Sequence, residues 1–212
     1  MEKDETSLSN LSRLFKWVHN KIMHDKRVQF LAEEILTILP PVNRVLDVGC
    51  GDGKLVRICN LKSNSKIRFV GIDKSNRYNT QDLLVYDGNN LPYEDNSFDA
   101  CMLCDVLHHL ISVDEIIKEV KRVSANYIII KDHLYRGPVD YCKLAIMDFV
   151  GNVPYGIETI YKFKTEQQWI QICKEQNLEI LAFKKEVRLY QSPLSWFFGA
   201  HLHCLLLLRV SK

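Results

Sequence analysis

Long apolar runs are missing from this sequence. No stretch reaches the roughly 18 consecutive apolar residues that a membrane-spanning helix needs, and the densest run, Leu205 to Leu208, is only strand-sized. The first ten residues, MEKDETSLSN, are polar and acidic and have no apolar core of the kind that signal peptides carry. We therefore expect no membrane span.

An excess of charge of either sign is also missing. Lys and Arg together number 28 against 26 for Asp and Glu, so the formal net charge is only +2 at pH 7. Domains that bind nucleic acid usually carry a clear basic excess. The balance therefore predicts a small-molecule substrate and no nucleic-acid partner, and it leaves the oligomeric state open.

The sequence has no disulfide-like cysteine pattern and no linker. Its seven cysteines are an odd number and are scattered mostly through apolar segments, which is typical of packing thiols in a reducing compartment, so we expect a cytoplasmic protein. Cys101 and Cys104 have the spacing C-x-x-C, but residues three apart on a strand point to opposite faces, which argues against a shared metal. Repeats and low-complexity segments are absent, so the 212 residues predict one α/β domain.

The most informative stretch that is present is VLDVGCGDGKL, residues 45–55. Its first residues predict a buried strand, and its three glycines allow a sharp turn into a helix that begins near Lys54. A turn of this kind presents backbone N–H groups to a ligand. The spacing is G-x-G-x-G and not the G-x-G-x-x-G of dinucleotide-binding proteins, and Asp47 within the strand would repel a pyrophosphate. The stretch therefore suits a ligand with a positively charged end.

At this point the sequence resembles the class I S-adenosylmethionine-dependent methyltransferases, whose first motif is similar and whose cofactor carries a sulfonium and an ammonium but no phosphate. The resemblance covers roughly residues 27–210. The stretches DVLHHL, KDH and MDFVGN are similar to small bacterial members of the type-11 methyltransferase domain group. The resemblance implies a Rossmann-like fold, with helices on both faces of a seven-stranded, mostly parallel sheet whose last strand is antiparallel.

The pattern of apolar residues agrees with that order of elements. Helical spacing predicts two helices within residues 7–39, ended by Pro40 and Pro41. Ser112 with Glu115, and Thr165 with Gln168, are predicted to cap two further helices. Strands are predicted at 45–48, 66–73, 83–87, 98–105, 126–131, 179–190 and 200–210, and a helix at 137–149. We divide the single domain into an N-terminal helical lid (1–41), a cofactor-binding half (42–133) and a substrate-side half (134–212).

Acidic residues end several of the predicted strands. Asp73 lies about 20 residues after the glycines, where an acid is expected to accept hydrogen bonds from both ribose hydroxyls. By resemblance, Asp87 would receive the amino group of the adenine. The cofactor is predicted to be S-adenosyl-L-methionine, released as S-adenosyl-L-homocysteine. Its predicted contacts are Asp47, Gly49, Cys50, Gly51, Asp73, Lys74, Asp87, Gly88, Asp105 and Val106.

Histidines are expected to gather on the rim above the cofactor. They are His108, His109, His133, His201 and His203. A sulfonium is already an activated electrophile, so the protein needs to hold the acceptor in line and to remove a proton where the acceptor carries one. We predict His109 or His133 as the base, with Asp132 as a neighbour that could orient His133, although adjacent side chains of a strand point apart. Structural histidines that close the rim are the alternative. Because nothing fixes a tetrahedral ligand spacing, we predict no metal site.

The predicted substrate contacts are His108, Tyr155, Trp196 and His201. Aromatic residues in the later loops suggest an apolar wall for the substrate. Asp148 lies in a mostly apolar helix and needs a partner, which leaves a structural ion pair and a substrate contact equally open. Lys26 and Arg27 either face the ligands or form an exposed basic turn.

The sequence thus predicts methyl transfer to a small-molecule acceptor by in-line displacement, assisted by a histidine base. One alternative is a subunit that binds S-adenosylmethionine without transferring a methyl group, and another is an aminopropyl-type transferase. A Rossmann dehydrogenase is the nearest structural alternative, and the glycine spacing argues against it.

Overall fold

The computed structural model describes residues 25–76, 83–152, 159–192 and 194–211. The first part of the predicted lid and the predicted substrate residue Tyr155 lie outside these ranges. No helix within them is long and apolar enough to cross a membrane.

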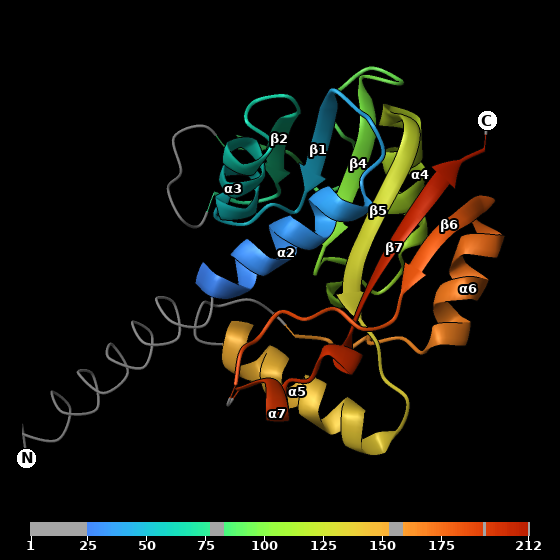
Figure 1. Ribbon diagram of the computed structural model, residues 1–212. Coiled ribbons are helices and arrows are strands. Elements are labelled where there is room, and N and C mark those ends of the chain that lie inside the picture. Colours follow the sequence, from blue (N-terminus) through green and yellow to red (C-terminus); the bar gives the residue numbers. More distant parts are fainter. Residues whose placement is uncertain (1–24, 77–82, 153–158, 193, 212) are drawn as a thin grey trace, which may run out of the picture.

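A single mixed sheet forms the centre of the described structure, with the strand order β3-β2-β1-β4-β5-β7-β6 (Figure 1). Strand β7 runs antiparallel to both of its neighbours, β5 and β6, and the pairs on the other side of β5 are parallel. This is the predicted Rossmann-like methyltransferase fold, which the structure therefore confirms. The strands are β1 Arg44–Val48, β2 Arg68–Asp73, β3 Leu84–Val85, β4 Phe98–Cys104, β5 Ser124–His133, β6 Leu178–Lys184 and β7 His203–Val210.

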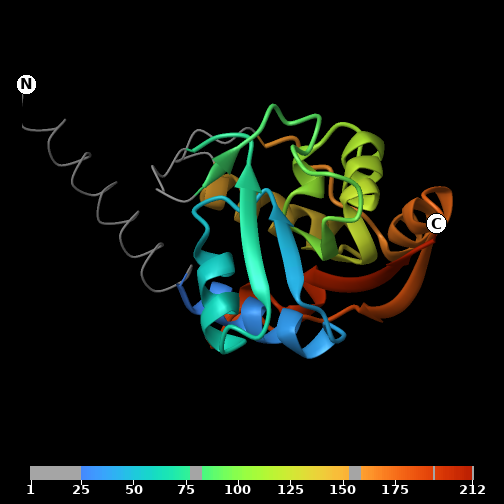
Figure 2. The ribbon, with the colours of Figure 1, turned by 90° about the horizontal axis from the view of Figure 1, so that it is seen from above.

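Helices cover both faces of the sheet, as Figure 2 shows from above. Buried side chains of α2 and α3 pack on one face, and those of α4 and α6 pack on the other. Two further helices, α5 and α7, lie beyond the carboxyl ends of the parallel strands (Figure 1), and we call them the cap. The helices are α2 Asp25–Ile38, α3 Lys54–Lys62, α4 Asp114–Val123, α5 Pro138–Asn152, α6 Glu166–Glu175 and α7 Leu194–Phe197, with short 3-10 turns η2 Leu107–His109 and η4 Ala200–Leu202.

The central strands are apolar on both faces because both faces are covered. In β4, Cys101 and Leu103 pack in the cluster that includes α4, whereas Met102 packs in the cluster that includes α2. Cys104 packs on the same side as Met102, so Cys101 and Cys104 lie on opposite faces as predicted. Continuous apolar composition is expected for parallel strands that are buried on both sides.

Some local predictions differ from the structure. Thr165 and Gln168 form both hydrogen bonds of a capping box, as predicted. The predicted capping box at Ser112 is wrong, because α4 begins at Asp114 and its N-cap is Val113. The hydroxyl of Ser112 contacts Asp114 instead. The third strand is limited to two residues, and β6 ends at Lys184, before the predicted end at residue 190.

Candidate active site

The glycine-rich turn joins β1 to α3 at the carboxyl edge of the sheet. Gly49, Gly51 and Gly53 all have positive φ angles, of 81°, 58° and 68°. A Cβ atom on Gly49 would lie 2.5 Å from Cγ2 of Val106, in the loop after β4. Only glycine fits this position without strain, because L-residues rarely adopt such a φ angle and the space is already filled. Two predicted cofactor segments, the turn and the loop at Val106, are therefore in direct contact.

Two aspartates lie at this turn, one in β1 and one at the end of β2. The carboxylate of Asp73 accepts hydrogen bonds from the backbone N–H of Gly51 (2.9 Å) and of Ser75 (3.1 Å). Asp47 is 1% exposed, and its Oδ1 has no hydrogen-bond partner among the described residues. Burial, with a smaller effect from Asp73, raises the pKa of Asp47 to about 8. An unpartnered buried carboxyl group beside a glycine turn fits a ligand that brings a positive charge.

The remaining predicted cofactor residues line the edge beside β2 and β3. Cys50 packs against Gly71, where a Cβ atom would lie 2.7 Å from the Cys50 sulfur. Lys74 lies beside Gly88, which has a φ angle of 88°. Asp87 is exposed, and its Oδ1 accepts hydrogen bonds from the backbone N–H of Asn89 and Asn90, both at 2.8 Å. Asp87 thus closes a turn, and its predicted contact with the adenine stays a prediction.

Asp105, the residue after β4, forms an ion pair with two cations. Arg27 of α2 contacts one carboxylate oxygen and Lys131 of β5 contacts the other. Burial alone would raise the pKa of Asp105, but Arg27 and Lys131 outweigh it and hold the pKa well below its usual range. Arg27 is therefore a half-buried residue paired with Asp105, and not part of an exposed basic turn. It ties α2 to the rim of the sheet.

Four of the five predicted rim histidines come together at the ends of β4, β5 and β7. His108 and His109 lie on η2, while His133 ends β5 and pairs in register with His203, the first residue of β7. The ring centroids of His108 and His133 are 4.4 Å apart. His201 is separate: its side chain is 36% exposed, and its Nε2 lies 3.4 Å from Asp140 of α5. His201 lies in the 3-10 turn η4, before β7 begins, and its side chain is not part of the histidine group.

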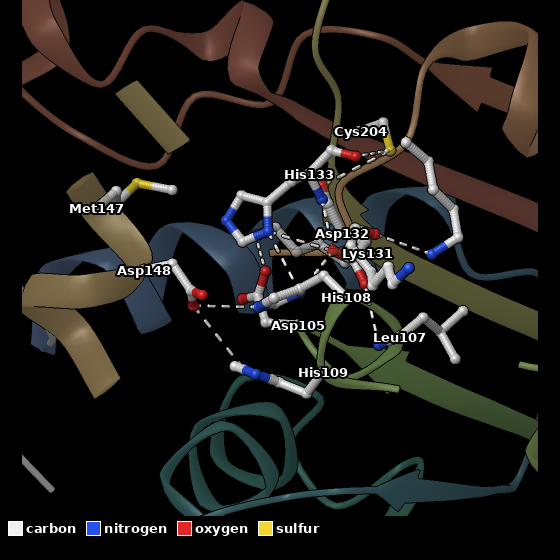
Figure 3. A network of polar contacts seen from close by, with 12 residues as sticks. Asp105, Leu107, His108, His109, Lys131, Asp132, His133, Met147, Asp148 and Cys204 are labelled. Atoms are coloured by element: carbon white, nitrogen blue, oxygen red, sulfur yellow. Dashed lines mark hydrogen bonds and ion pairs between the residues drawn. The ribbon is translucent and has the colours of Figure 1, made fainter. Parts of the chain in front are cut away.

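Asp132 is the centre of this group, as Figure 3 shows. Its Oδ1 lies 2.8 Å from Nδ1 of His108 and 3.2 Å from Nδ1 of His133. The backbone N–H groups of Leu107 and His133 donate to the same carboxylate, at 3.1 and 2.7 Å. Asp132 therefore touches His133, which the sequence left in doubt, but its shortest side-chain contact is with His108.

Asp148 extends the group from the cap. It lies on α5 and is 3% exposed, and its Oδ1 is 3.4 Å from Nε2 of His108 and 4.0 Å from Nε2 of His109. The amide of Asn152 donates to the same oxygen. The sequence did not assign Asp148 to the site, although an acid in an apolar helix was a signal that it needed a partner. His108 is thus held between two carboxylates.

The histidines differ in charge because they differ in surroundings. Burial would lower the pKa of His108, but Asp132 and Asp148 outweigh it and raise the pKa to about 9. Burial and the neighbouring His108 lower the pKa of His133 to about 4 and also lower the pKa of His109. At neutral pH a free His133 is therefore uncharged and a weak base. The side chain of His109 is 22% exposed and is the more accessible of the two predicted bases.

The predicted aromatic wall is divided between two places. Tyr135 and Tyr161 pack with Phe163 and Leu144 under α5, next to the histidine group. Trp196 on α7 is 82% exposed and belongs to none of the buried apolar clusters of the described residues. Of the predicted substrate residues, His108 is buried whereas Trp196 and His201 are exposed, so His108 does not share a surface with the other two. Their contact with a substrate stays a prediction.

Comparison with known proteins finds similar methyltransferases. Residues 46–126 match a family model described as a methyltransferase domain. A human protein named probable tRNA methyltransferase 9B is 32% identical over 102 residues, which cover 45% of this chain and 20% of that protein. A tRNA (carboxymethyluridine(34)-5-O)-methyltransferase from Arabidopsis thaliana is 33% identical over 99 residues, which cover 41% of this chain and 23% of that protein. The chain thus spans about a fifth of the length of these curated relatives.

The fold also matches solved structures. A SAM-dependent methyltransferase from Aquifex aeolicus superposes with a TM-score of 0.61 at 16% identity, covering 94% of this chain and 98% of that one. At this level of identity the match shows the fold alone. It covers the cap as well as the segment that the family model matches.

The relatives correct one prediction. The small-molecule substrate without a nucleic-acid partner is contradicted, because these relatives are named for methyl transfer to tRNA. Net charge misled here because it sums over the whole chain, whereas a nucleic-acid contact depends on where the charges lie.

The predicted enzyme class and cofactor agree with the methyltransferase domain that residues 46–126 match and with the SAM-dependent methyltransferase that shares the fold. The glycine turn, Asp47 and Asp73 all lie within the residues that the family model matches. Residues 46–126 thus match a methyltransferase domain, and the chain shares the fold of a SAM-dependent methyltransferase of known structure.

Proposed function

We propose that this protein transfers the methyl group of S-adenosylmethionine to a nucleoside of RNA, with tRNA as the first acceptor to test. The observation that carries the proposal is the cofactor cradle itself. The Gly49 turn, the unpartnered Asp47 and the Asp73 carboxylate lie on the same rim as the histidine group. A cationic cofactor and a group of polar side chains that can hold an acceptor are then adjacent.

The choice of RNA is supported by the named relatives and by the surface of the cap. Trp196 and Phe197 are 82% and 45% exposed, and the ammonium of Lys143 lies 5.8 Å from the Phe197 ring. Exposed aromatic rings next to cations are the usual platform for unpaired bases. We therefore expect a base of the acceptor RNA to stack on Trp196.

A second supporting feature is a groove of about 640 Å³ at the end of β6. Its lining includes four basic residues and two acids, namely Arg136, Lys184, Lys185, Arg188, Glu34 and Glu186. Lys184 is already paired with Glu34, and Lys185 with Glu166. The guanidinium of Arg136 instead donates to the carbonyl oxygens of His201 (2.9 Å) and Lys185 (3.4 Å). Phosphate groups of an RNA chain fit such a cationic groove.

The reaction would be an in-line displacement at the sulfonium methyl group. Where the acceptor atom carries a proton, His109 fits the role of base better than His133, because His109 is more accessible and the pKa of His133 is only about 4. A carboxylate acceptor, such as the carboxymethyl group in the Arabidopsis relative's name, is already ionised at pH 7 and needs no base. The histidine base therefore stays a prediction that depends on the acceptor.

The test is transfer of a labelled methyl group from S-adenosylmethionine to total tRNA, to unmodified tRNA transcripts and to a pool of small metabolites. We expect label in the tRNA fraction with the wild-type protein and none with Asp73→Ala. Label that appears only in the metabolite pool would contradict the RNA acceptor. Cofactor binding by calorimetry without any transfer would instead support a binding subunit.

We also propose that the protein works in a reducing compartment such as the cytoplasm. All seven cysteines are free thiols, and six of them are buried or partly buried. Thiols that serve as packing residues are typical of such compartments. Fractionation of the native host, followed by detection of the protein, would test the location.

A further inference from the structure

We propose that His108, His109 and Asp148 form a binding site for one divalent transition-metal ion. One ligand atom from each of the three side chains lies within 4.8 Å of the others. Figure 3 shows Asp148 pointing from α5 toward both histidines of η2. The site thus bridges the cap and the end of β4, and it does not depend on the proposed function.

The distances between the ligand atoms suit an ion better than direct hydrogen bonds. Zn–N and Zn–O bonds are about 2.0–2.2 Å, so adjacent ligand atoms around one ion lie roughly 3.0–3.5 Å apart. Nε2 of His108 is 3.4 Å from Oδ1 of Asp148, which is within this range. Nε2 of His109 is 4.0 Å from the same oxygen, too far for a hydrogen bond and close enough to reach an ion after a small rotation of the ring.

His108 contacts a carboxylate through Nδ1, the nitrogen that would not bind the ion, as metal-binding histidines commonly do. Nδ1 of His108 lies 2.8 Å from Asp132, and the backbone N–H groups of Leu107 and His133 hold that carboxylate in place. A histidine that binds a metal through one nitrogen commonly donates its other N–H to a carboxylate, which fixes the tautomer. Here this pairing directs Nε2 of His108 toward Asp148.

Two buried polar atoms at the site lack partners among the described residues. They are Oδ2 of Asp148 and Nδ1 of His109. A proton on His108 accounts for its own contact with Oδ1 of Asp148, but it leaves Oδ2 of that carboxylate without a partner. Nδ1 of His109 lies on the other side of the ring from Nε2, so an ion bound at Nε2 would engage Asp148 and not this atom. Buried polar atoms are rarely left unpaired, so a further group at this position is expected. The carboxylates of Asp132 and Asp148 together carry the two negative charges that balance a divalent ion.

The ligand set indicates the kind of ion. Two imidazole nitrogens and one carboxylate suit Zn²⁺, Fe²⁺, Co²⁺ or Mn²⁺ and leave coordination positions open. The site follows Val106, which packs on the Gly49 turn, by only two residues. An ion held there would lie beside the cofactor and could orient and polarise an acceptor oxygen or nitrogen. With the ion bound, the lone pair of His109 is engaged, so this inference and His109 as a free base exclude one another.

The test uses Co²⁺ as the probe, titrated into the metal-free full chain and followed by its visible absorption, with Zn²⁺ competition measured by calorimetry. We expect one equivalent of Co²⁺ with wild-type protein and binding at least about tenfold weaker in both His109→Gln and Asp148→Asn. Asp132→Asn should weaken binding by about 10- to 100-fold, because it removes the carboxylate behind His108. His201→Gln is the matched control, since His201 also lies 3.4 Å from an aspartate of α5 but outside the site, and it should bind like wild type.

Cofactor binding by calorimetry serves as the check that each variant is folded. If wild-type protein gives no Co²⁺ spectrum, or if His109→Gln and Asp148→Asn bind Co²⁺ as tightly as wild type while still binding the cofactor, the site does not exist. Failure of the metal site with intact methyl transfer to tRNA would leave the proposed function standing. Stoichiometric metal binding without methyl transfer to any acceptor would overturn the proposed function alone.

Discussion

Lowering the pH should weaken cofactor binding through one residue, Asp47. The pKa of this buried carboxyl group is raised to about 8, so about nine-tenths of the protein carries a protonated Asp47 at pH 7. A cofactor with a sulfonium and an ammonium favours the ionised form. Binding should therefore release close to one proton per cofactor at pH 7.

The expected magnitude follows from the ionised fraction of Asp47 in the free protein. This fraction, and with it the association constant, rises about ninefold between pH 6 and pH 7, which is roughly 1.3 kcal/mol. The range is chosen because the amino group of the cofactor, with a pKa near 8, stays protonated throughout it. The sign is fixed: affinity increases with pH as Asp47 loses its proton.

The assay is calorimetry of S-adenosylmethionine binding at pH 6 and pH 7, in buffers that differ in their heat of ionisation. Wild-type protein should show a buffer-dependent heat that reports the released proton, and Asp47→Asn should show neither this heat nor the pH dependence. An equal slope in both proteins, or heats that do not depend on the buffer, would refute the assignment of the unpartnered carboxyl group to the positive end of the cofactor.

Three further changes test the fold and the proposed acceptor. Gly49→Ala should lower the free energy of unfolding by about 1–3 kcal/mol in thermal unfolding, because its Cβ atom would lie 2.5 Å from Val106 at a φ angle of 81°. Gly137→Ala is the control: its Cβ atom would meet nothing within 4 Å, so the free energy of unfolding should change little. Lys131→Met should lower the free energy of unfolding in urea by about 3–5 kcal/mol, because it breaks the buried ion pair with Asp105. Arg209→Met removes the exposed ion pair with Glu179 and should lower it by less than about 1 kcal/mol. Equal losses of unfolding free energy for Gly49→Ala and Gly137→Ala, or for Lys131→Met and Arg209→Met, would contradict the packing described here. Trp196→Ala should weaken tRNA binding by about 5- to 100-fold in a filter assay without lowering the melting temperature, and unchanged affinity would remove Trp196 from the RNA surface.

The sequence by itself determined the elements whose cause is local. The glycine turn could be predicted because positive φ angles and close approach to Val106 require glycine. The central strands could be predicted because both of their faces are buried, and the Thr165 capping box because it lies within four consecutive residues. Together with the resemblance to a known family, these features gave the strand order.

Only the tertiary structure decided how the polar side chains are paired. Asp132 was predicted beside His133, its neighbour in the chain, but its shortest side-chain contact is with His108, which is 24 residues away and lies at the end of another strand. Asp148 reaches the site from a helix that the sequence could not place over the rim, and Arg27 is paired with Asp105 across 78 residues. Such pairings depend on which strand ends adjoin and on side-chain rotamers, and neither is encoded in the spacing of residues along the chain.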